Sequence, residues 1–117
     1  SGQAPVKNGK FPYLGKVGVD LTEEEGVKAA ELCAINIIAT IQYSIENDWD
    51  KLDTFIKIGG FVNCKNDYTN HPQIINGASD LIVKIFGERG RHSRFAVGSN
   101  SLPLNISVEI EAIVNLK

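Results

Sequence analysis

The chain has 117 residues, of which 43% are hydrophobic and 22% are charged, a composition typical of one ordinary globular domain. Lys plus Arg number 12 and Asp plus Glu number 14, and the resulting formal charge of -2 argues against a protein held mainly to nucleic acid by phosphate contacts. No apolar run reaches the roughly 18 residues of a membrane span, and no signal peptide is visible. We therefore expect a single cytoplasmic domain over residues 1–117.

The first half of the chain predicts a short strand end, a long loop and a helix. Residues 1–6 have some apolar content, and residues 7–21 carry the Gly and Pro residues typical of loops. Thr22 and Glu25 have the spacing of a capping box, which predicts a helix that ends at residues 47–50. Apolar residues then recur at helical spacing and predict one buried face: Val27, Ala30, Ala34, Ile37, Ile38, Ile41 and Ile45.

The second half predicts a strand, a helix and two further strands. Residues 53–64 are rich in β-branched and aromatic side chains, and Gly59-Gly60 predicts a bulge or a close backbone approach. A second helix begins near Pro72 and is closed by Gly87. Its predicted apolar face contains Ile74, Ile75, Ala78, Leu81, Ile82, Ile85 and Phe86. Residues 94–98 predict a short strand. In residues 106–114 the side chains of the apolar set alternate strictly with the others, which is the pattern of a half-buried strand.

The predicted order is β-α-β-α-β-β, an α+β layer with two helices on one face of a mixed sheet. Glu109, Glu111 and Ile113 then lie on the other face, which must meet solvent or another subunit. Because Ile113 and aromatic strand residues are poorly suited to water, we expect an oligomer.

Three arginines, Arg89, Arg91 and Arg94, fall within six residues, whereas the nine lysines are scattered. A guanidinium fork matches a carboxylate, so this window predicts an anion site, with Arg94 at a loop-to-strand junction as its best candidate. The alternative is a surface ion pair. Glu109, inside an apolar strand, is a candidate to hold a water or move a proton, or else simply faces solvent.

The remaining reactive side chains predict little chemistry. Cys33 and Cys64 lack a C-x-x-C spacing and are expected to be reduced, buried thiols, Cys64 with the better chance of partial exposure. His71 and His92 have no carboxylate or cysteine at ligand spacing, so neither a metal site nor a Ser-His-Asp arrangement is expected. No phosphate-binding glycine motif is present. We expect no cofactor.

Residues 94–112, R-F-A-V-G-S-N-S-L-P-L-N-I-S-V-E-I-E-A, resemble the C-terminal signature of the Rid (reactive intermediate deaminase) or YjgF family. Residues 1–5, S-G-Q-A-P, resemble the family's S-G-Q-x-P strand end. Residues 75–81, I-N-G-A-S-D-L, and residues 87–94, G-E-R-G-R-H-S-R, look like one branch of it. The resemblance covers essentially the whole chain, and against the family's pattern the chain lacks the first N-terminal strand.

The resemblance implies a chorismate-mutase-like fold, assembled as a homotrimer with clefts between subunits. It also implies hydrolysis of enamine or imine acids such as 2-aminoacrylate to 2-keto acids and ammonia, without metal or cofactor. By motif match Arg94 would bind the substrate carboxylate and Glu109 would position the attacking water. Ser1, Gly2 and Asn76 would line the substrate cavity.

Two alternatives remain open. Many active members carry a Cys two positions after the Arg, where this chain has Ala96, and this favours a non-catalytic protein that binds small carboxylic acids in the same cleft. Some relatives are called endoribonucleases or translation inhibitors. The charge of -2 and the absence of a basic stripe with stacking aromatics count against that activity. We expect neither nucleic acid nor a membrane as a partner.

Overall fold

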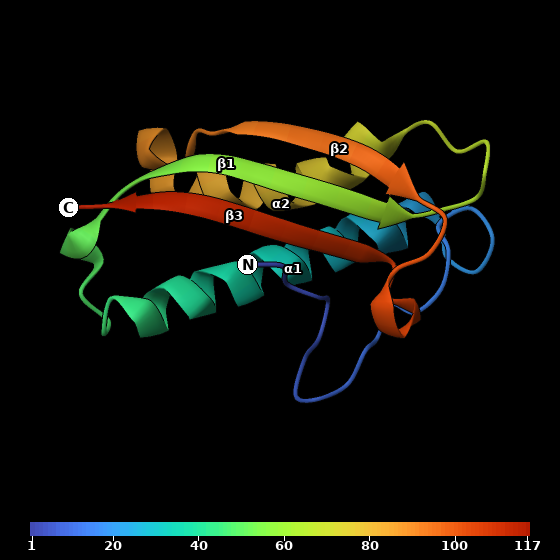
Figure 1. Cartoon of the computed structure of the whole chain (residues 1–117), viewed down its shortest axis with the longest axis horizontal. Helices are drawn as coiled ribbons and strands as arrows, with labels where there is room; N and C mark the ends of the chain where they lie inside the picture. Colours follow the sequence, from blue (N-terminus) through green and yellow to red (C-terminus); the bar gives the residue numbers. More distant parts are fainter.

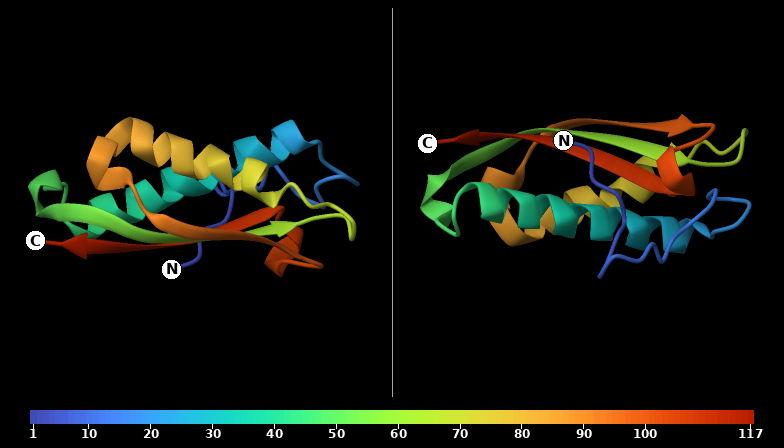
Figure 2. Two further views of the ribbon diagram at one scale, coloured as in Figure 1. Left: turned by 90° about the horizontal axis from the view of Figure 1, so that it is seen from above. Right: turned by 60° about the horizontal axis from the view of Figure 1, so that its bottom comes forward.

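Two helices lie side by side on one face of a three-stranded sheet (Figures 1 and 2). The computed structural model describes all 117 residues. In chain order the elements are α1 (Glu23–Ser44), β1 (Leu52–Asn63), α2 (His71–Phe86), β2 (Ser93–Ser99) and β3 (Val108–Leu116). The sheet order is β2-β1-β3, with β1 parallel to β2 and antiparallel to β3. The predicted α+β class with a mixed sheet is confirmed.

The predicted start of α1 is confirmed in detail. The Glu25 backbone N–H donates to Thr22 Oγ1 at 3.1 Å, and the Thr22 N–H donates to a Glu25 carboxylate oxygen at 3.0 Å, which satisfies two otherwise free donors. The helix ends at Ser44, earlier than predicted, because Glu46 and Asn47 adopt positive φ angles of 54° and 63°.

The glycine pair in β1 allows α2 to pack closely on the sheet. A Cβ atom at Gly60 would lie 2.6 Å from the Ile75 Cδ1 atom of α2, so the predicted close approach is confirmed. The predicted alternative, a bulge at this pair, is wrong. The register shifts between β1 and β3 instead occur earlier, between residues 52 and 57.

The core lies between the helices and the sheet and contains fully buried isoleucines from both layers. Cys33 and Cys64 are free and buried, and Cys64, only 5% exposed, is more enclosed than expected. Ile85 is 53% exposed, so its predicted place on the buried face of α2 is wrong. No helix combines the length and the apolar character needed to span a membrane.

The N-terminal segment is tied to the free edge of β3, although it forms no strand of its own. Gln3 and Ile110 exchange two backbone hydrogen bonds of 2.8 and 3.1 Å, a single bridge in place of the predicted first strand. β3 itself begins at Val108 rather than at Ile106, because Ile106 pairs with Leu14 of the loop.

The face of the sheet opposite the helices is uncovered, and Figure 2 shows both helices on the other side. Phe61 of β1 and Phe95 of β2 meet there edge to face, with ring centroids 5.2 Å apart. Glu109 pairs with Phe61, and Glu111 pairs with Gly59. Ile113 is 47% exposed. The predicted positions of these three β3 residues on the uncovered face are therefore confirmed.

Candidate functional site

Arg94 lies near the start of β2 with its side chain directed toward α2. It pairs with Ile58 of β1, which is fully buried beneath the helices, so both side chains share the helix-covered face. Its Nη1 donates to Ser79 Oγ at 3.1 Å, and its Nη2 donates to the Pro72 carbonyl at 3.4 Å. The half-buried guanidinium is thus held by α2 at two points and keeps further N–H groups for a ligand.

Ser79 is in turn bonded to His92. The Nε2 atom of His92 lies 2.9 Å from Ser79 Oγ, and its Nδ1 atom lies 2.6 Å from the Gly90 carbonyl oxygen. A carbonyl oxygen only accepts, so His92 Nδ1 donates to the Gly90 carbonyl, and Nε2 shares the second hydrogen bond with the Ser79 hydroxyl. The expectation that His92 is isolated is therefore wrong, because folding brings it to a serine 13 positions away.

These side chains surround an open hollow of about 270 Å³ between α2 and the start of β2. Its lining is mostly polar: Asn76, Ser79, Asp80, Val83, Arg91, His92 and Arg94. Asn76 and Arg94 thus line the same hollow. Arg91 also forms an exposed ion pair with Glu88 at 3.0 Å, whereas Arg89 points away and donates to the Leu52 carbonyl.

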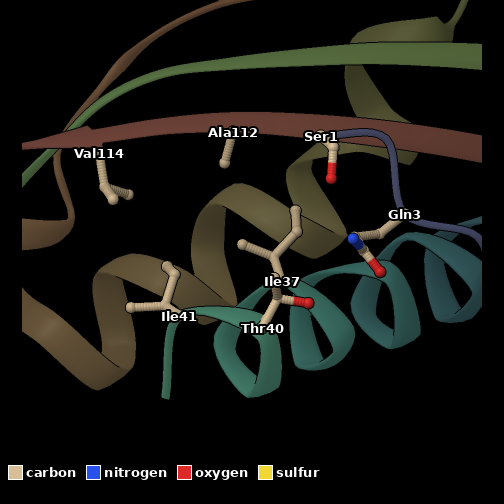
Figure 3. Close-up of a pocket in the computed structure, with 7 residues that line it drawn as sticks. All are labelled: Ser1, Gln3, Ile37, Thr40, Ile41, Ala112 and Val114. Atoms are coloured by element: carbon tan, nitrogen blue, oxygen red, sulfur yellow. The ribbon is translucent and has the colours of Figure 1, made fainter. Parts of the chain in front are cut away.

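Glu109 lies at the other edge of the sheet, beside the N-terminus. A Cβ atom at Gly2 would lie 2.6 Å from a Glu109 carboxylate oxygen, so the glycine leaves room for that side chain. Ser1 lines a cavity of about 50 Å³ between α1 and β3, with Ile37, Thr40 and Ala112 among its neighbours (Figure 3). Gly2 and Glu109 therefore form a second group of candidate residues, whereas Ser1, at the same edge of the sheet, lines a cavity on the helix-covered side.

The structure does not bring the two groups together within one chain. Arg94 is on β2 and faces the helices, whereas Glu109 is on β3 and faces away from them, with β1 between the two strands. None of the hollows in the structure is lined by both residues.

Neither cysteine thiol has a lowered pKa. Burial raises the pKa of the Cys33 thiol, and the Glu109 charge raises it further. Burial also raises the pKa of Cys64, opposed by the Lys16 charge and a hydrogen bond from the Ser99 backbone. Cys64 Sγ lies 3.4 Å from His71 Nε2, so His71 is not isolated as expected. No group of three or more His, Cys, Asp or Glu side chains is placed to hold a metal ion.

The residues that sequence reasoning missed are Ser79 and His92. One belongs to I-N-G-A-S-D-L and the other to G-E-R-G-R-H-S-R, the two segments that set this chain's branch apart. Their joint presence was the available signal, but only the fold shows that they touch.

The family model described as "YjgF/chorismate mutase-like, putative endoribonuclease" matches residues 1–116. The chain belongs to this family. The YjgF identification made from the sequence motifs is therefore confirmed.

Similar proteins come from several organisms. Protein TCP17 of Trypanosoma cruzi is 39% identical over 117 residues, which cover 99% of this chain and 72% of that protein. Protein Atu1372 of Agrobacterium tumefaciens, of unknown function, is 46% identical with a TM-score of 0.97, covering 99% of this chain and 74% of that one. A "putative endoribonuclease" of Shewanella oneidensis is 34% identical with a TM-score of 0.94, and the match covers 99% of this chain and 76% of that one.

Proposed function

We propose that this family member hydrolyses reactive enamine or imine acids of the 2-aminoacrylate type to 2-keto acids and ammonia. The observation that carries the proposal is the Arg94 fork, fixed by Ser79 and the Pro72 carbonyl at the rim of an open hollow. A fork held in this way is ready to accept a carboxylate at little further cost in side-chain entropy.

Once the substrate acid is oriented, the reaction needs only the addition of one water and the transfer of one proton. The imine carbon is already electrophilic, so one water must add to it, and one proton must reach the departing nitrogen. The carboxylate of Glu109 suits the first task because it can accept a proton from water, and the Arg94 guanidinium neutralises the substrate's own charge. The products are the 2-keto acid and ammonia, and no redox change occurs.

We further propose that the working site forms between copies of the chain in a homotrimer. Arg94 and Asn76 lie at one edge of the sheet and Glu109 and Gly2 at the other, so a neighbouring copy has to supply the second group. The uncovered sheet face, with Phe61, Phe95 and Ile113, offers apolar surface for that contact.

The main alternative is a non-catalytic protein that binds a small carboxylic acid on the same Arg94 fork, and Ala96 in place of a cysteine favours it. The endoribonuclease description of the relatives finds less support. The chain carries a net charge of -2, and two glutamates share the uncovered face with its aromatic rings.

The deciding experiment couples the protein to a pyridoxal-phosphate lyase that releases 2-aminoacrylate and follows pyruvate formation. Arg94→Lys keeps the charge but removes the fork, and we expect a loss of roughly 10- to 100-fold, the worth of one shielded charge-assisted hydrogen bond. Arg89→Lys, in the same arginine window but directed at the Leu52 carbonyl, is the matched control. Unchanged turnover in Arg94→Lys would remove the role assigned to Arg94.

A further inference from the structure

A thiol and an imidazole meet where β1 and β2 end, at the other end of β2 from Arg94. The two strands run parallel, so Asn63 at the end of β1 pairs with Ser99 at the end of β2 (Figure 1). Cys64 follows β1 directly, and its Sγ atom lies 3.4 Å from Nε2 of His71, the first residue of α2. The fold thus places a potential nucleophile in contact with a side chain that can take its proton.

The pair lines an open hollow of about 340 Å³, which shares no lining residue with the hollow at Arg94. Gly98 of β2 keeps the space beside the pair clear. A Cβ atom at Gly98 would lie 2.6 Å from His71 Nε2 and 3.1 Å from Cys64 Sγ. Both reactive atoms therefore border a space that a side chain at position 98 would fill, and a small reagent can approach them from the hollow.

The imidazole of the pair is held in place by Tyr68. The Tyr68 ring meets the His71 ring edge to face, with the two centroids 5.6 Å apart. The Tyr68 hydroxyl in turn donates to a Glu23 carboxylate oxygen of α1 at 2.7 Å, which fixes the aromatic ring. A nucleophile, a base and a group that orients the base are the parts of an activated nucleophile, and this corner of the fold has all three.

The charges around this hollow favour an anionic reagent. Lys65 lines it, whereas no carboxylate does. Asp67 comes no closer than 3.7 Å to the Lys65 ammonium, and both side chains are exposed. The Lys16 charge also acts on Cys64, because it opposes the rise that burial causes in the pKa of the thiol. A small molecule that carries carboxylates is therefore attracted to the hollow more than a cationic one is.

We propose that Cys64 is a nucleophilic thiol that exchanges with small anionic disulfides, with His71 as its base and Tyr68 as the residue that positions the base. The Cys64 sulfur forms a bond to one sulfur of the disulfide, and the S–S bond of the reagent breaks. The thiol proton passes to His71 Nε2 and from there to the departing thiolate. Cys64 is thereby oxidised to a mixed disulfide, and the departing half of the reagent is reduced and released as a thiol.

The reaction depends on His71 because the thiol alone is a poor nucleophile. Burial raises the pKa of Cys64, so little thiolate is present until a base removes the proton. Cys33 provides the comparison within the same chain. It is fully buried, its Sγ atom contacts the Val108 carbonyl oxygen at 3.7 Å, and it lines none of the hollows. Cys33 should therefore stay unmodified in the folded protein.

The test incubates the folded protein with oxidised glutathione and follows the adduct by intact-mass spectrometry, with peptide mapping to locate it. Wild type and Cys33→Ser should gain one glutathione at Cys64, and Cys64→Ser should gain none. His71→Asn should react roughly 100-fold more slowly, because the base is lost. Gln73→Asn, an exposed change in the same first turn of α2, is the matched control and should react at the wild-type rate.

Two further changes test the geometry without altering the thiol or the imidazole. In Gly98→Ala the added Cβ must displace the imidazole, so exchange should slow by roughly 10-fold or more. Tyr68→Phe keeps the ring against His71 and should react nearly as fast as wild type, whereas Tyr68→Ala loses the ring and should be slower. In urea all of these variants should react alike, because the differences depend on the folded structure.

Three results would overturn the proposal. The first is a folded wild type in which Cys64 reacts no faster than Cys33, and the second is an equal rate in wild type and His71→Asn. The third is faster exchange with cystamine, a dicationic disulfide, than with oxidised glutathione, once each rate is divided by its value in urea. The assay involves no imino acid, so its result is independent of the proposed deaminase activity.

Discussion

The two edges of the sheet carry complementary chemistry. The β2 edge, together with α2, presents the guanidinium of Arg94, the amide of Asn76 and the Ser79–His92 pair. The β3 edge presents the carboxylate of Glu109 and the backbone at Gly2. The first group can hold an acid, and the second can activate a water, so neither group alone accounts for the proposed reaction.

The distance between the edges explains why one chain is not enough. Neighbouring strands are about 4.8 Å apart, so β2 and β3, separated by β1, lie roughly 10 Å apart. The carboxylate and the imine carbon of a 2-imino acid are directly bonded. A water attacking that carbon must therefore lie close to Arg94, and Glu109 of the same chain is too far away and on the other face.

The largest effect is expected at the β3 edge. Glu109→Gln keeps the shape of the side chain but removes the proton acceptor, so kcat should fall about 10²- to 10⁴-fold. Pyruvate binding, which depends on Arg94, should be nearly unchanged. Glu111→Gln, two residues along the same strand, is the control. Loss of pyruvate binding together with kcat would contradict the assignment of carboxylate binding to Arg94 and of proton acceptance to Glu109.

A smaller effect at the same edge is expected from Gly2→Ala. The added Cβ would lie 2.6 Å from the Glu109 carboxylate oxygen, so the carboxylate must move, and kcat should fall by about 10-fold or more. Because both changes act on one group, Gly2→Ala should cost nothing further in a Glu109→Gln background. Additive losses measured in steady-state kinetics would show that Gly2 acts independently of Glu109.

The strand between the edges, β1, is expected to be more sensitive to added side chains on its helix-covered face than on its uncovered face. Gly60→Ala places a Cβ 2.6 Å from the buried side chain of Ile75 and should lower the free energy of unfolding by about 1–3 kcal/mol. In Gly59→Ala the nearest atoms belong to the half-buried Phe95 ring, which lies outside the core between the helices and the sheet, so the loss in free energy of unfolding of one chain should be smaller. Urea denaturation of both variants tests this order, and the reverse order contradicts the packing described.

The smallest effect concerns pH. Hydrogen bonds from Tyr68 and then Asn70 lower the pKa of Glu23 below 4.5, and they tie α1 to the segment that leads into α2. The stabilisation is present above about pH 4.5 and is lost as the pH falls through the lowered pKa. Because Glu23 is only partly buried, the effect should be slight. Melting curves of Glu23→Gln should show less acid destabilisation than wild type, and equal acid destabilisation contradicts the assignment. Glu24→Gln is the control.

The periodic elements were predictable because they depend on local patterns. The Thr22–Glu25 capping box, the alternation of the last strand and the glycine pair of β1 each have a physical reason that is visible in the sequence. The helix end at Ser44 depends on two residues with positive φ, which no spacing rule indicated. The apolar content of residues 1–6 is too weak a basis for predicting a strand, and the structure has only the bridge at Gln3.

The site was less predictable because its partners meet only in three dimensions. The confinement of the arginines points to Arg94, and the resemblance to the family points to Asn76, Gly2 and Glu109 as well. The contact between Ser79 and His92 requires α2 to pack beside the start of β2, and a serine within a helix is an unremarkable residue in any pattern. Likewise, the separation of Arg94 from Glu109 follows from the strand order β2-β1-β3, which the sequence does not give.

The central claim, a site completed by a neighbouring copy, is tested most directly by mixing two inactive variants. Arg94→Ala and Glu109→Gln chains are co-refolded in equal amounts, and deaminase activity is compared with wild type. If the site takes Arg94 from one copy and Glu109 from another, about a quarter of the sites regain both groups, and activity returns to about that fraction. If both groups act within one chain, every chain keeps a defect, and a mixture as inactive as its separate components contradicts the account.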